Sequence, residues 1–254
     1  MKRLSSVIQY VCNAKKRHGT HSPFVYDFAD KCLSLQIDSP DKHVIKNYHA
    51  ALKHNSQSIS ITDFGAGSKK LGNIRKIKDI YSCSQSDSRY GKLLYQLCKH
   101  YAPAHILELG TSLGLGTLMM HLGNPTAQIE SIEGCPATHH FTASNFPIQS
   151  EQITFVNDTF EHYFTGIQAK QFDLIFIDGN HQGEALLRYI DQLLPYSHND
   201  TIWILDDIRW SDDMWTTWNT IIQMPHFHVS IDLFRMGIIV ERKEQFKEHF
   251  WIKQ

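Results

Sequence analysis

Two apolar runs in the second half of the chain end in carboxylates. FDLIFIDGNH ends with Asp178 and carries His181 three residues later, and WILDDIRW ends with Asp206 and Asp207. Ligands and catalytic groups in open α/β sheets gather at the carboxyl ends of the strands, so these side chains are candidates for one site. Neighbouring carboxylates repel one another unless some are protonated or a cation lies among them. A hard divalent cation with oxygen ligands, Mg²⁺ by preference, would remove this repulsion.

The same residues also allow structural interpretations. Asp206 or Asp207 would cap the following turn if no metal binds, and His181 would be an exposed turn residue or a hydrogen-bond partner of Asp178. The chain holds 16 histidines, so His181 gains weight only from its position at a strand end beside an acid. Tryptophans after the second run would form an aromatic wall or, more commonly at this spacing, pack in the core: Trp210, Trp215 and Trp218.

A glycine-rich turn connects an apolar strand and an apolar helix in residues 105–120, HILELGTSLGLGTLMM. Gly110, Gly114 and Gly116 let the backbone turn sharply and approach a ligand. The free N–H groups of the helix N-terminus face the same place. The dinucleotide fingerprint fits poorly, because Met119 stands where its third glycine would fall. NAD is therefore disfavoured as the ligand of this turn.

An acidic residue, Glu133, ends the next apolar run at residues 129–132. An acid after the second strand accepts the ribose hydroxyls in nucleotide-binding α/β folds. Together with the glycine-rich turn, it favours adenosine without a pyrophosphate. The alternative is a plain strand-to-helix connection, against which the later carboxylates argue.

From about residue 91 to 210 the chain resembles the class I S-adenosylmethionine-dependent methyltransferases, and within them the catechol O-methyltransferase-like group. The segments GKLLYQLCKHYAP, ELG, SIEG, ITFVNDTFEHY, FDLIFIDGNH and WILDDIRW follow one another in the order and spacing of that group. The resemblance implies a site for S-adenosylmethionine, with Glu133 on the ribose and residues 158–160 beside the adenine. Its residues would be Ser86, Glu108, Gly110, Thr111, Ser112, Gly114, Gly116, Glu133, Asp158, Thr159, Phe160 and Asp178.

The resemblance also implies catalytic roles. In that group an aspartate after the fourth strand and an Asp-Asn pair after the fifth hold a metal ion, and a lysine is the base. Asp178 and Asp206 match the two aspartates, while Asp207 replaces the asparagine and His181 replaces the lysine. Both changes are chemically permissible, since an oxygen ligand and a base are kept. The implied metal ligands are therefore Asp178, Asp206 and Asp207, and the implied catalytic residues are His181 and Asp178.

The reaction that the resemblance implies is O-methyl transfer from S-adenosylmethionine to a small hydroxylated acceptor, catechols and other phenols included, with Mg²⁺ assisting. Two alternatives stay open: a metal-independent N- or O-methyltransferase of small molecules, and a non-catalytic adenosylmethionine-binding interaction protein. A nucleic-acid methyltransferase is disfavoured because the chain has no N-P-P-[YF] stretch.

Strand-like and helical segments alternate regularly from about residue 90. Apolar runs near residues 105–109, 128–132, 152–156, 173–177 and 201–205 predict strands, and two further runs near 227–233 and 237–241 predict a terminal hairpin. With the resemblance, this rhythm predicts an α/β, Rossmann-like fold. We expect a mostly parallel seven-stranded sheet, helices on both faces and an antiparallel C-terminal hairpin.

Residues 1–85 are expected to form a helical N-terminal extension and a loop, ahead of a methyltransferase domain at 86–254. Ser22 before Pro23 predicts a helix N-terminus, and another helical stripe is made by Val44, Ile45, Tyr48 and Leu52. An amphipathic helix that packs or faces a partner is predicted at the start of the chain by Leu4, Val7, Ile8 and Val11.

The polar, serine-rich stretch between residues 55 and 88 predicts a loop. It contains DFGAG at residues 63–67, which matches the first methyltransferase motif literally. No alternation of strand and helix continues from it, so we interpret it as a loop near the mouth of the active site.

The composition of the chain limits the classes of function that the protein can have. The net charge of −1 and the pI near 7.0 argue against a nucleic-acid or membrane-surface binder, and favour a small-molecule acceptor. The five cysteines form no C-x-x-C pair, so neither a disulfide framework nor a zinc site is indicated. We expect a cytoplasmic enzyme, with a homodimer as one possible assembly.

Overall fold

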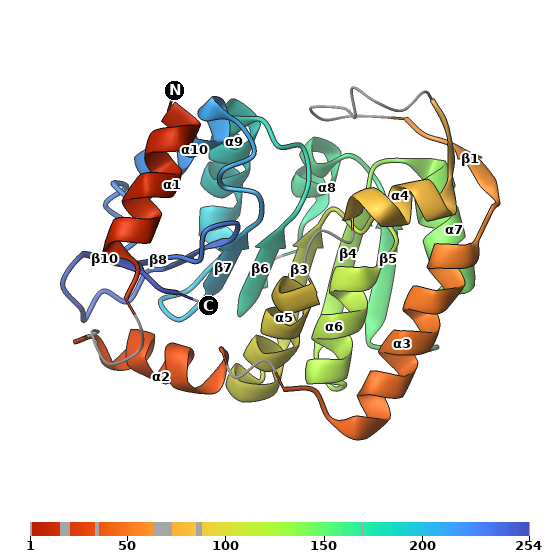
Figure 1. Cartoon of the computed structure of the whole chain (residues 1–254), viewed down its shortest axis with the longest axis horizontal. Helices are drawn as coiled ribbons and strands as arrows, with labels where there is room; N and C mark the ends of the chain where they lie inside the picture. Colours follow the sequence, from red (N-terminus) through yellow and green to blue (C-terminus); the bar gives the residue numbers. More distant parts are fainter. Residues whose placement is uncertain are drawn as a thin grey trace.

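The computed structural model describes residues 2–15, 21–33, 36–62, 73–84, 88–168 and 170–253. Its centre is an eight-stranded sheet in the order β10-β8-β9-β7-β6-β3-β4-β5 (Figure 1). The strands of this sheet are β3 (His105–Leu109), β4 (Gln128–Glu133), β5 (Ile153–Asn157), β6 (Leu174–Ile177), β7 (Ile202–Leu205), β8 (Val229–Asp232), β9 (Gly237–Val240) and β10 (Glu248–Trp251).

The pairing within this sheet is mostly parallel. Strands β3 to β7 run in the same direction, and β9 lies antiparallel between β7 and β8. The predicted Rossmann-like sheet with antiparallel C-terminal strands is therefore confirmed. The structure adds one strand to the predicted seven, because β10 pairs in parallel with β8.

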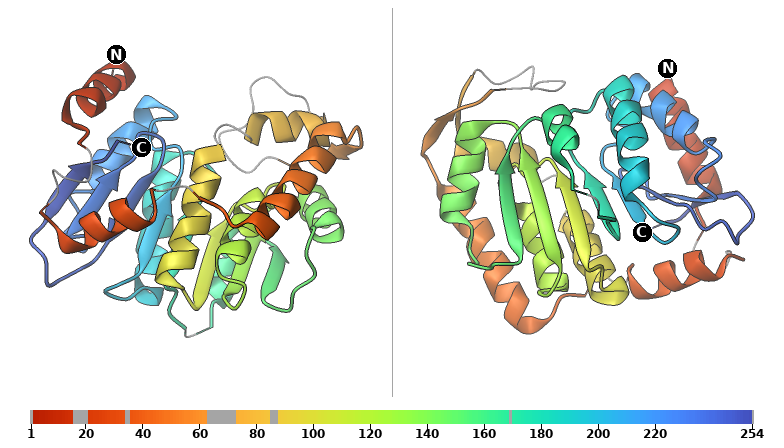
Figure 2. Two further views of the ribbon diagram at one scale, coloured as in Figure 1. Left: turned by 60° about the horizontal axis from the view of Figure 1, so that its bottom comes forward. Right: turned by 180° about the vertical axis from the view of Figure 1, so that it is seen from behind.

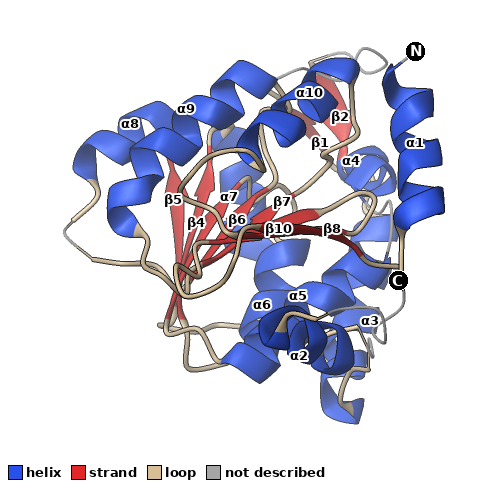
Figure 3. Ribbon diagram, turned by 90° about the vertical axis from the view of Figure 1, so that its left-hand side faces the viewer, coloured by secondary structure: helices blue, strands red, loops and turns tan. Residues whose placement is uncertain are grey.

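Helices cover both faces of the sheet, as predicted. Helices α5 and α6 lie on one face, and α8, α9 and α10 lie on the other (Figure 3). Strands buried on both faces must be apolar throughout, which explains the runs LIFI in β6 and IWIL in β7. The helices are α1 (Lys2–Asn13), α2 (Pro23–Lys31), α3 (Ser39–His54), α4 (Ile77–Ser84), α5 (Ser88–Tyr101), α6 (Leu115–Gly123), α7 (Pro136–Asn145), α8 (Phe160–Gly166), α9 (Gly183–Leu193) and α10 (Asp212–Ile221).

The N-terminal helices form where the sequence predicts them. Ser22 caps α2 by accepting a hydrogen bond from the N–H of Val25 at 3.4 Å. Helix α1 stands beside α10 (Figure 2), and Tyr10 donates a hydrogen bond to the carbonyl of Ile252 at 2.7 Å. On its outer side Ile8 and Val11 are 57% and 71% exposed. Part of the predicted apolar stripe of α1 therefore faces solvent.

The predicted loop between residues 55 and 88 is wrong for three segments. Residues 58–60 (β1, Ser58–Ser60) and 74–76 (β2, Ile74–Lys76) form an antiparallel pair, and α4 follows. Helix α4 forms because Ile77 and Tyr81, four residues apart, are both buried against a small core with α3. The DFGAG segment at residues 63–67 lies outside the described residues.

The tryptophans divide between core and surface. Trp215 and Trp218 are buried in α10, as their helical spacing predicts, whereas Trp210 is 52% exposed. Among the described helices, none has the length and apolar character needed to cross a membrane.

Candidate active site

Strands β3 and β6 meet closely at the glycine-rich turn. The N–H of Asp178 donates to the carbonyl of Leu109 at 2.9 Å. Gly110 has φ +106°, and a Cβ at this position would overlap the carbonyl oxygen of Asp178. The missing side chain of Gly110 therefore lets the two strand ends lie close together, and its contact with a cofactor stays a prediction.

Glu108 is buried beneath the same turn. Its side chain accepts hydrogen bonds from the hydroxyls of Thr117 and Ser131, and a Cβ on Gly116 would overlap its Oε1 atom. Burial raises the pKa of Glu108 to about 7, partly offset by the two hydroxyl donors. Glu108 and Gly116 hold the turn from below, and their contact with a cofactor stays a prediction.

The ends of β3 and β4 are joined by Glu133. Its carboxylate accepts from the N–H of Ser112 at 2.9 Å and from the N–H of Cys135 at 2.8 Å. Nearby, the hydroxyls of Thr111 and Ser131 share a hydrogen bond of 2.6 Å. Each carboxylate oxygen can accept more than one hydrogen bond, so these two contacts are compatible with the predicted binding of ribose hydroxyls by Glu133.

The turn continues into α6 through Gly114. This residue has φ +71° and is the N-cap of the helix. A Cβ there would lie 2.9 Å from a methyl group of Thr142 and 3.1 Å from the ring of Phe146. Glycine is needed at this position both for its backbone angle and for packing against the α7 side of the turn.

The residues predicted beside the adenine follow β5. Asp158 donates its N–H to the carbonyl of Glu133 at 3.2 Å, so it lies next to the predicted ribose acid. Thr159 caps α8, and the ring of Phe160 packs against Tyr189 at 5.5 Å between centroids and borders Gly179. The structure brings this segment and the glycine-rich turn to one edge of the sheet. Ser86 lies outside the described residues.

The predicted acidic cluster forms at the ends of β6 and β7. His181 Nε2 lies 4.0 Å from Asp178 Oδ1 and 3.9 Å from Asp207 Oδ2. Its ring stands 5.8 Å from that of the exposed Trp210. Burial and the charges of Asp206 and Asp207 raise the pKa of Asp178 well above its usual range. Asp178 therefore keeps its proton to a higher pH than an ordinary aspartate does, which relieves part of the repulsion expected from the sequence.

An arginine that no sequence pattern indicated completes the cluster. Arg235 precedes β9 and donates two hydrogen bonds to the carboxylate of Asp206, from Nε to Oδ1 at 2.9 Å and from Nη2 to Oδ2 at 2.6 Å. Its Nε also lies 3.0 Å from Oδ1 of Asp207. In the sequence, Arg235 could have been noticed from its position in the turn at residues 234–236 between two apolar runs. The structure places this turn at the acidic strand end because β9 pairs with β7.

These residues do not fit a divalent cation. Asp206 has both oxygens on Arg235, and Asp207 shares the same guanidinium. In the described part of the chain, no group of three or more histidine, cysteine or acidic side chains converges as metal ligands. The predicted set of Asp178, Asp206 and Asp207 is thus assembled, but around an arginine.

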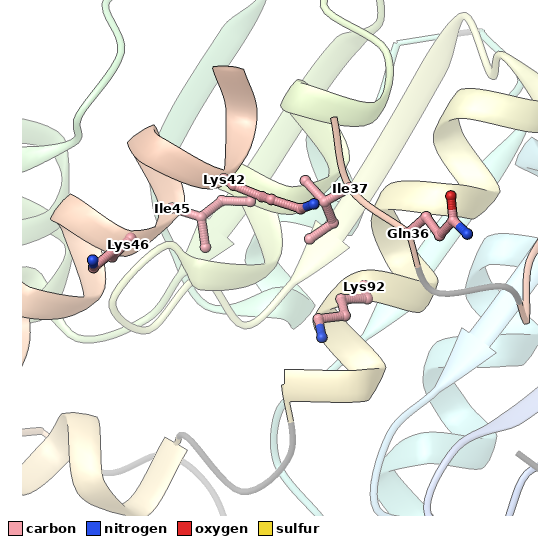
Figure 4. A pocket seen from close by; sticks show the side chains of 6 residues that line it. All are labelled: Gln36, Ile37, Lys42, Ile45, Lys46 and Lys92. Carbon is pink, nitrogen blue, oxygen red and sulfur yellow. The ribbon is translucent and has the colours of Figure 1, made fainter. Parts of the chain in front are cut away.

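A separate hollow of about 460 Å³ lies between α3 and α5 (Figure 4). Its lining is basic and apolar and contains none of the predicted site residues. The lining residues are Gln36, Ile37, Lys42, Ile45, Lys46 and Lys92.

Residues 107–208 match a family model described as a methyltransferase domain. Over these residues, 102 of 254, the chain is similar to a methyltransferase domain. This match covers the strands that bear the glycine-rich turn, Glu133 and the acidic strand ends, so the family resemblance seen in the sequence is confirmed. No curated protein matches the sequence.

Solved methyltransferases share the fold. A methyltransferase from Podospora anserina bound to S-adenosylhomocysteine superposes with a TM-score of 0.58 at 14% identity, over 87% of this chain and 97% of the other. An O-methyltransferase from Streptomyces achromogenes, solved with S-adenosylmethionine, gives 0.57 at 13% identity, over 85% and 95%. An O-methyltransferase from Bacillus cereus with S-adenosylhomocysteine gives 0.54 at 16% identity, over 81% and 92%. At these identities the likeness shows the fold alone.

Replacing Gly110 by alanine should destabilise the methyltransferase by about 2–4 kcal/mol, because a Cβ there is strained at positive φ and overlaps the backbone of Asp178. Urea unfolding followed by circular dichroism measures the loss. Gly166→Ala is the matched control, since a Cβ at Gly166 meets nothing within 4 Å. Equal stability of the two variants would contradict the close approach of β3 and β6.

Replacing Glu108 by glutamine should stabilise the protein increasingly as the pH rises from 5 to 8. The folded-state pKa of Glu108 is raised to about 7, so its favourable contribution is complete below about pH 4.5 and is lost as the pH rises through 7. Glutamine cannot ionise and escapes this loss, which amounts to at most about 3 kcal/mol. Urea unfolding at pH 5.5 and 8 tests the prediction, with the exposed Glu151→Gln as control. A difference from wild type that is the same at both pH values would contradict it.

Proposed function

We propose that this protein transfers a methyl group from S-adenosylmethionine to a hydroxyl oxygen of a small acceptor, phenols included. The observation that carries the proposal is the meeting of two residue sets at one edge of a methyltransferase-domain sheet. One set surrounds Glu133 and the glycine-rich turn, and the other surrounds His181 and the acidic strand ends. The O-methyltransferases among the solved structures support the choice of oxygen as the acceptor atom.

The chain's own residues would hold S-adenosylmethionine, which supplies the electrophilic methyl group when bound. Glu133 would accept the ribose hydroxyls with its carboxylate oxygens. The turn around Ser112 lies against the methionine part, and the segment from Asp158 to Phe160 lies beside the adenine. The contacts of Glu133 with Ser112 and Cys135 fix the carboxylate before a ligand arrives, which lowers the entropic cost of binding.

His181 and Trp210 would receive the acceptor. The ring of Trp210 is exposed and tilted by 39° to that of His181, so a planar acceptor can lie against it. His181 Nε2 is held 3.9–4.0 Å from two carboxylates. That separation leaves the nitrogen available to take the proton of a bound hydroxyl, and the carboxylates stabilise the imidazolium that results.

The arrangement of Arg235 favours metal-independent transfer over the Mg²⁺-assisted reaction that the sequence suggested. Mg²⁺ on Asp178, Asp206 and Asp207 would require Asp206 to leave its two hydrogen bonds with Arg235. Chelation separates the two hypotheses, because turnover that falls to background with EDTA and returns with Mg²⁺ would support the metal-assisted reaction.

The remaining assignments rest on the sequence. We propose a methyltransferase domain at 86–254 with residues 1–85 as an extension, a cytoplasmic location and a small-molecule acceptor. The outward-facing apolar side chains of α1 leave a homodimer open. The non-catalytic alternative would be supported by tight binding of S-adenosylhomocysteine without methyl transfer to any acceptor of a broad panel.

Glu133→Ala should weaken binding of S-adenosylhomocysteine by about 2 kcal/mol, from the loss of charged hydrogen bonds to the ribose. Isothermal titration calorimetry measures the affinity, and thermal unfolding confirms that the variant is folded. Glu151→Ala, an exposed glutamate away from the site, is the control. Unchanged affinity in a folded Glu133→Ala protein would remove this residue from the cofactor site.

His181→Ala should leave the affinity for S-adenosylhomocysteine unchanged and slow the chemical step by roughly 10²–10⁴-fold, the usual contribution of a general base. The loss should shrink at high pH and with more acidic phenols, because these ionise without help. Single-turnover rates over a series of substituted phenols measure this dependence. An equal loss with every phenol at every pH would indicate that His181 only positions the acceptor, and normal rates would exclude it from the reaction.

A further inference from the structure

The positive charge among the carboxylates at the ends of β6 and β7 comes from a side chain of the protein. Arg235 lies among Asp178, Asp206 and Asp207, with two hydrogen bonds to Asp206 and a third contact to Asp207. A guanidinium stays protonated at any pH at which the protein is folded, and it is more weakly hydrated than an ammonium group. It can therefore neutralise buried carboxylates permanently, without an equilibrium with free ions.

The backbone that carries Arg235 is fixed by several independent bonds. The hydroxyl of Tyr90 donates to the carbonyl of Leu233 at 3.0 Å and accepts from the N–H of Arg235 at 3.2 Å. The carbonyl of Arg235 accepts from the N–H of Ile208 at 2.9 Å, which ties the turn to the segment after Asp207. The guanidinium is thus held at the strand ends before any ligand binds.

A second buried arginine supports the same turn. Arg209 binds Asp232 with two hydrogen bonds of 2.7 and 2.6 Å and donates to the carbonyl of Phe234 at 2.6 Å. Both side chains of this pair are at most 5% exposed. The residues before and after Phe234 therefore have little freedom to withdraw Arg235 from the acidic cluster.

One edge of the Arg235 guanidinium has no hydrogen-bond partner among the described residues. Its Nε and Nη2 atoms face Asp206, whereas Nη1 makes no hydrogen bond to any residue in the described ranges. His181 contacts the same cluster through Asp207, whose side chain lies near both Arg235 and His181. An acceptor oxygen between Arg235 and His181 would have a cation on one side and a base on the other.

We propose that Arg235 is the resident cation of this active site, taking the place of a divalent ion and binding the acceptor oxygen through Nη1. This inference rests on the proposed methyl transfer. The acceptor's O–H proton passes to His181, and the guanidinium stabilises the oxygen's negative charge until that oxygen forms its bond to the methyl group.

Arg235 in place of a metal ion also determines how many hydroxyl groups the acceptor needs. A metal ion that coordinates two oxygens of one ligand selects vicinal hydroxyls, since both occupy its coordination sphere. A single N–H edge needs only one oxygen. The site should therefore accept phenols with a single hydroxyl as readily as catechols.

The deciding experiment measures metal binding rather than turnover. Titration of the wild-type protein with Mn²⁺, followed by electron paramagnetic resonance, should show no saturable site at the acidic cluster. Arg235→Ala should bind one Mn²⁺ at least about 10-fold more tightly than wild type, because Asp206 and Asp207 lose a guanidinium that neutralised them. Adding Asp206→Asn to Arg235→Ala should abolish this gained site.

Controls separate the cluster from general charge effects. Arg188→Ala removes an exposed arginine on α9 that pairs with Glu184, and it should bind Mn²⁺ as wild type does. Circular dichroism establishes folding, and Arg235→Gln is used if the alanine variant unfolds. A saturable Mn²⁺ site in the wild type that Asp206→Asn removes would overturn the proposal, as would a folded Arg235 variant that gains none.

Separate readouts keep this inference distinct from the proposed function. Calorimetry with S-adenosylhomocysteine tests the cofactor site, and its failure would count against methyl transfer without altering the Mn²⁺ result. For turnover, EDTA should leave the wild-type rates with phenol and catechol unchanged, whereas Arg235→Ala should lower both. A wild-type preference for catechol that EDTA abolishes would contradict the single-oxygen acceptor.

Discussion

The ion pair between Asp206 and Arg235 is the interaction on which the acceptor half of the site depends. Asp206 is only 3% exposed, and a carboxylate so deeply placed needs a bound cation or a proton. Arg235 supplies the cation from the turn before β9, a strand that pairs directly with β7. The C-terminal antiparallel strands thus do more than complete the sheet, because they carry the charge that allows acidic residues to end β7.

The cofactor half depends on a close approach of backbones. A side chain on Gly110 would overlap the carbonyl of Asp178, so the turn that would hold S-adenosylmethionine lies directly against the residue that begins the acidic cluster. Glu133 then joins this turn to β4 through the N–H of Ser112. Because rigid strands carry both halves, a bound methyl donor and a bound acceptor would be aligned by the sheet itself, which is how positioning lowers the barrier of a transfer between two ligands.

The sequence predicted the parts of the structure whose signals are local. Apolar runs predicted the core strands, and parallel strands bring their carboxyl ends to one edge, which is why Asp178 and Asp206 could be placed together. Arg235 escaped prediction because its effect depends on the pairing of β9 with β7, which residues 206–236 separate along the chain. Helix α4 escaped because only Ile77 and Tyr81 mark its buried side within a serine-rich segment. Strand β10 escaped because its EHFW sequence shows one buried residue, Phe250, and no strong alternation.

Charge balance connects the arginine to the proposed base. Asp206 and Asp207 both contact the guanidinium of Arg235, and Asp207 also lies 3.9 Å from His181 Nε2. If His181 takes a proton from the acceptor as proposed, the imidazolium forms beside the carboxyl groups of Asp178 and Asp207, which favour the charge that develops during the reaction. A divalent ion at the same place would add positive charge beside His181 and oppose its protonation. A fixed monovalent cation such as Arg235 opposes that protonation less, which is why it is compatible with a histidine base here.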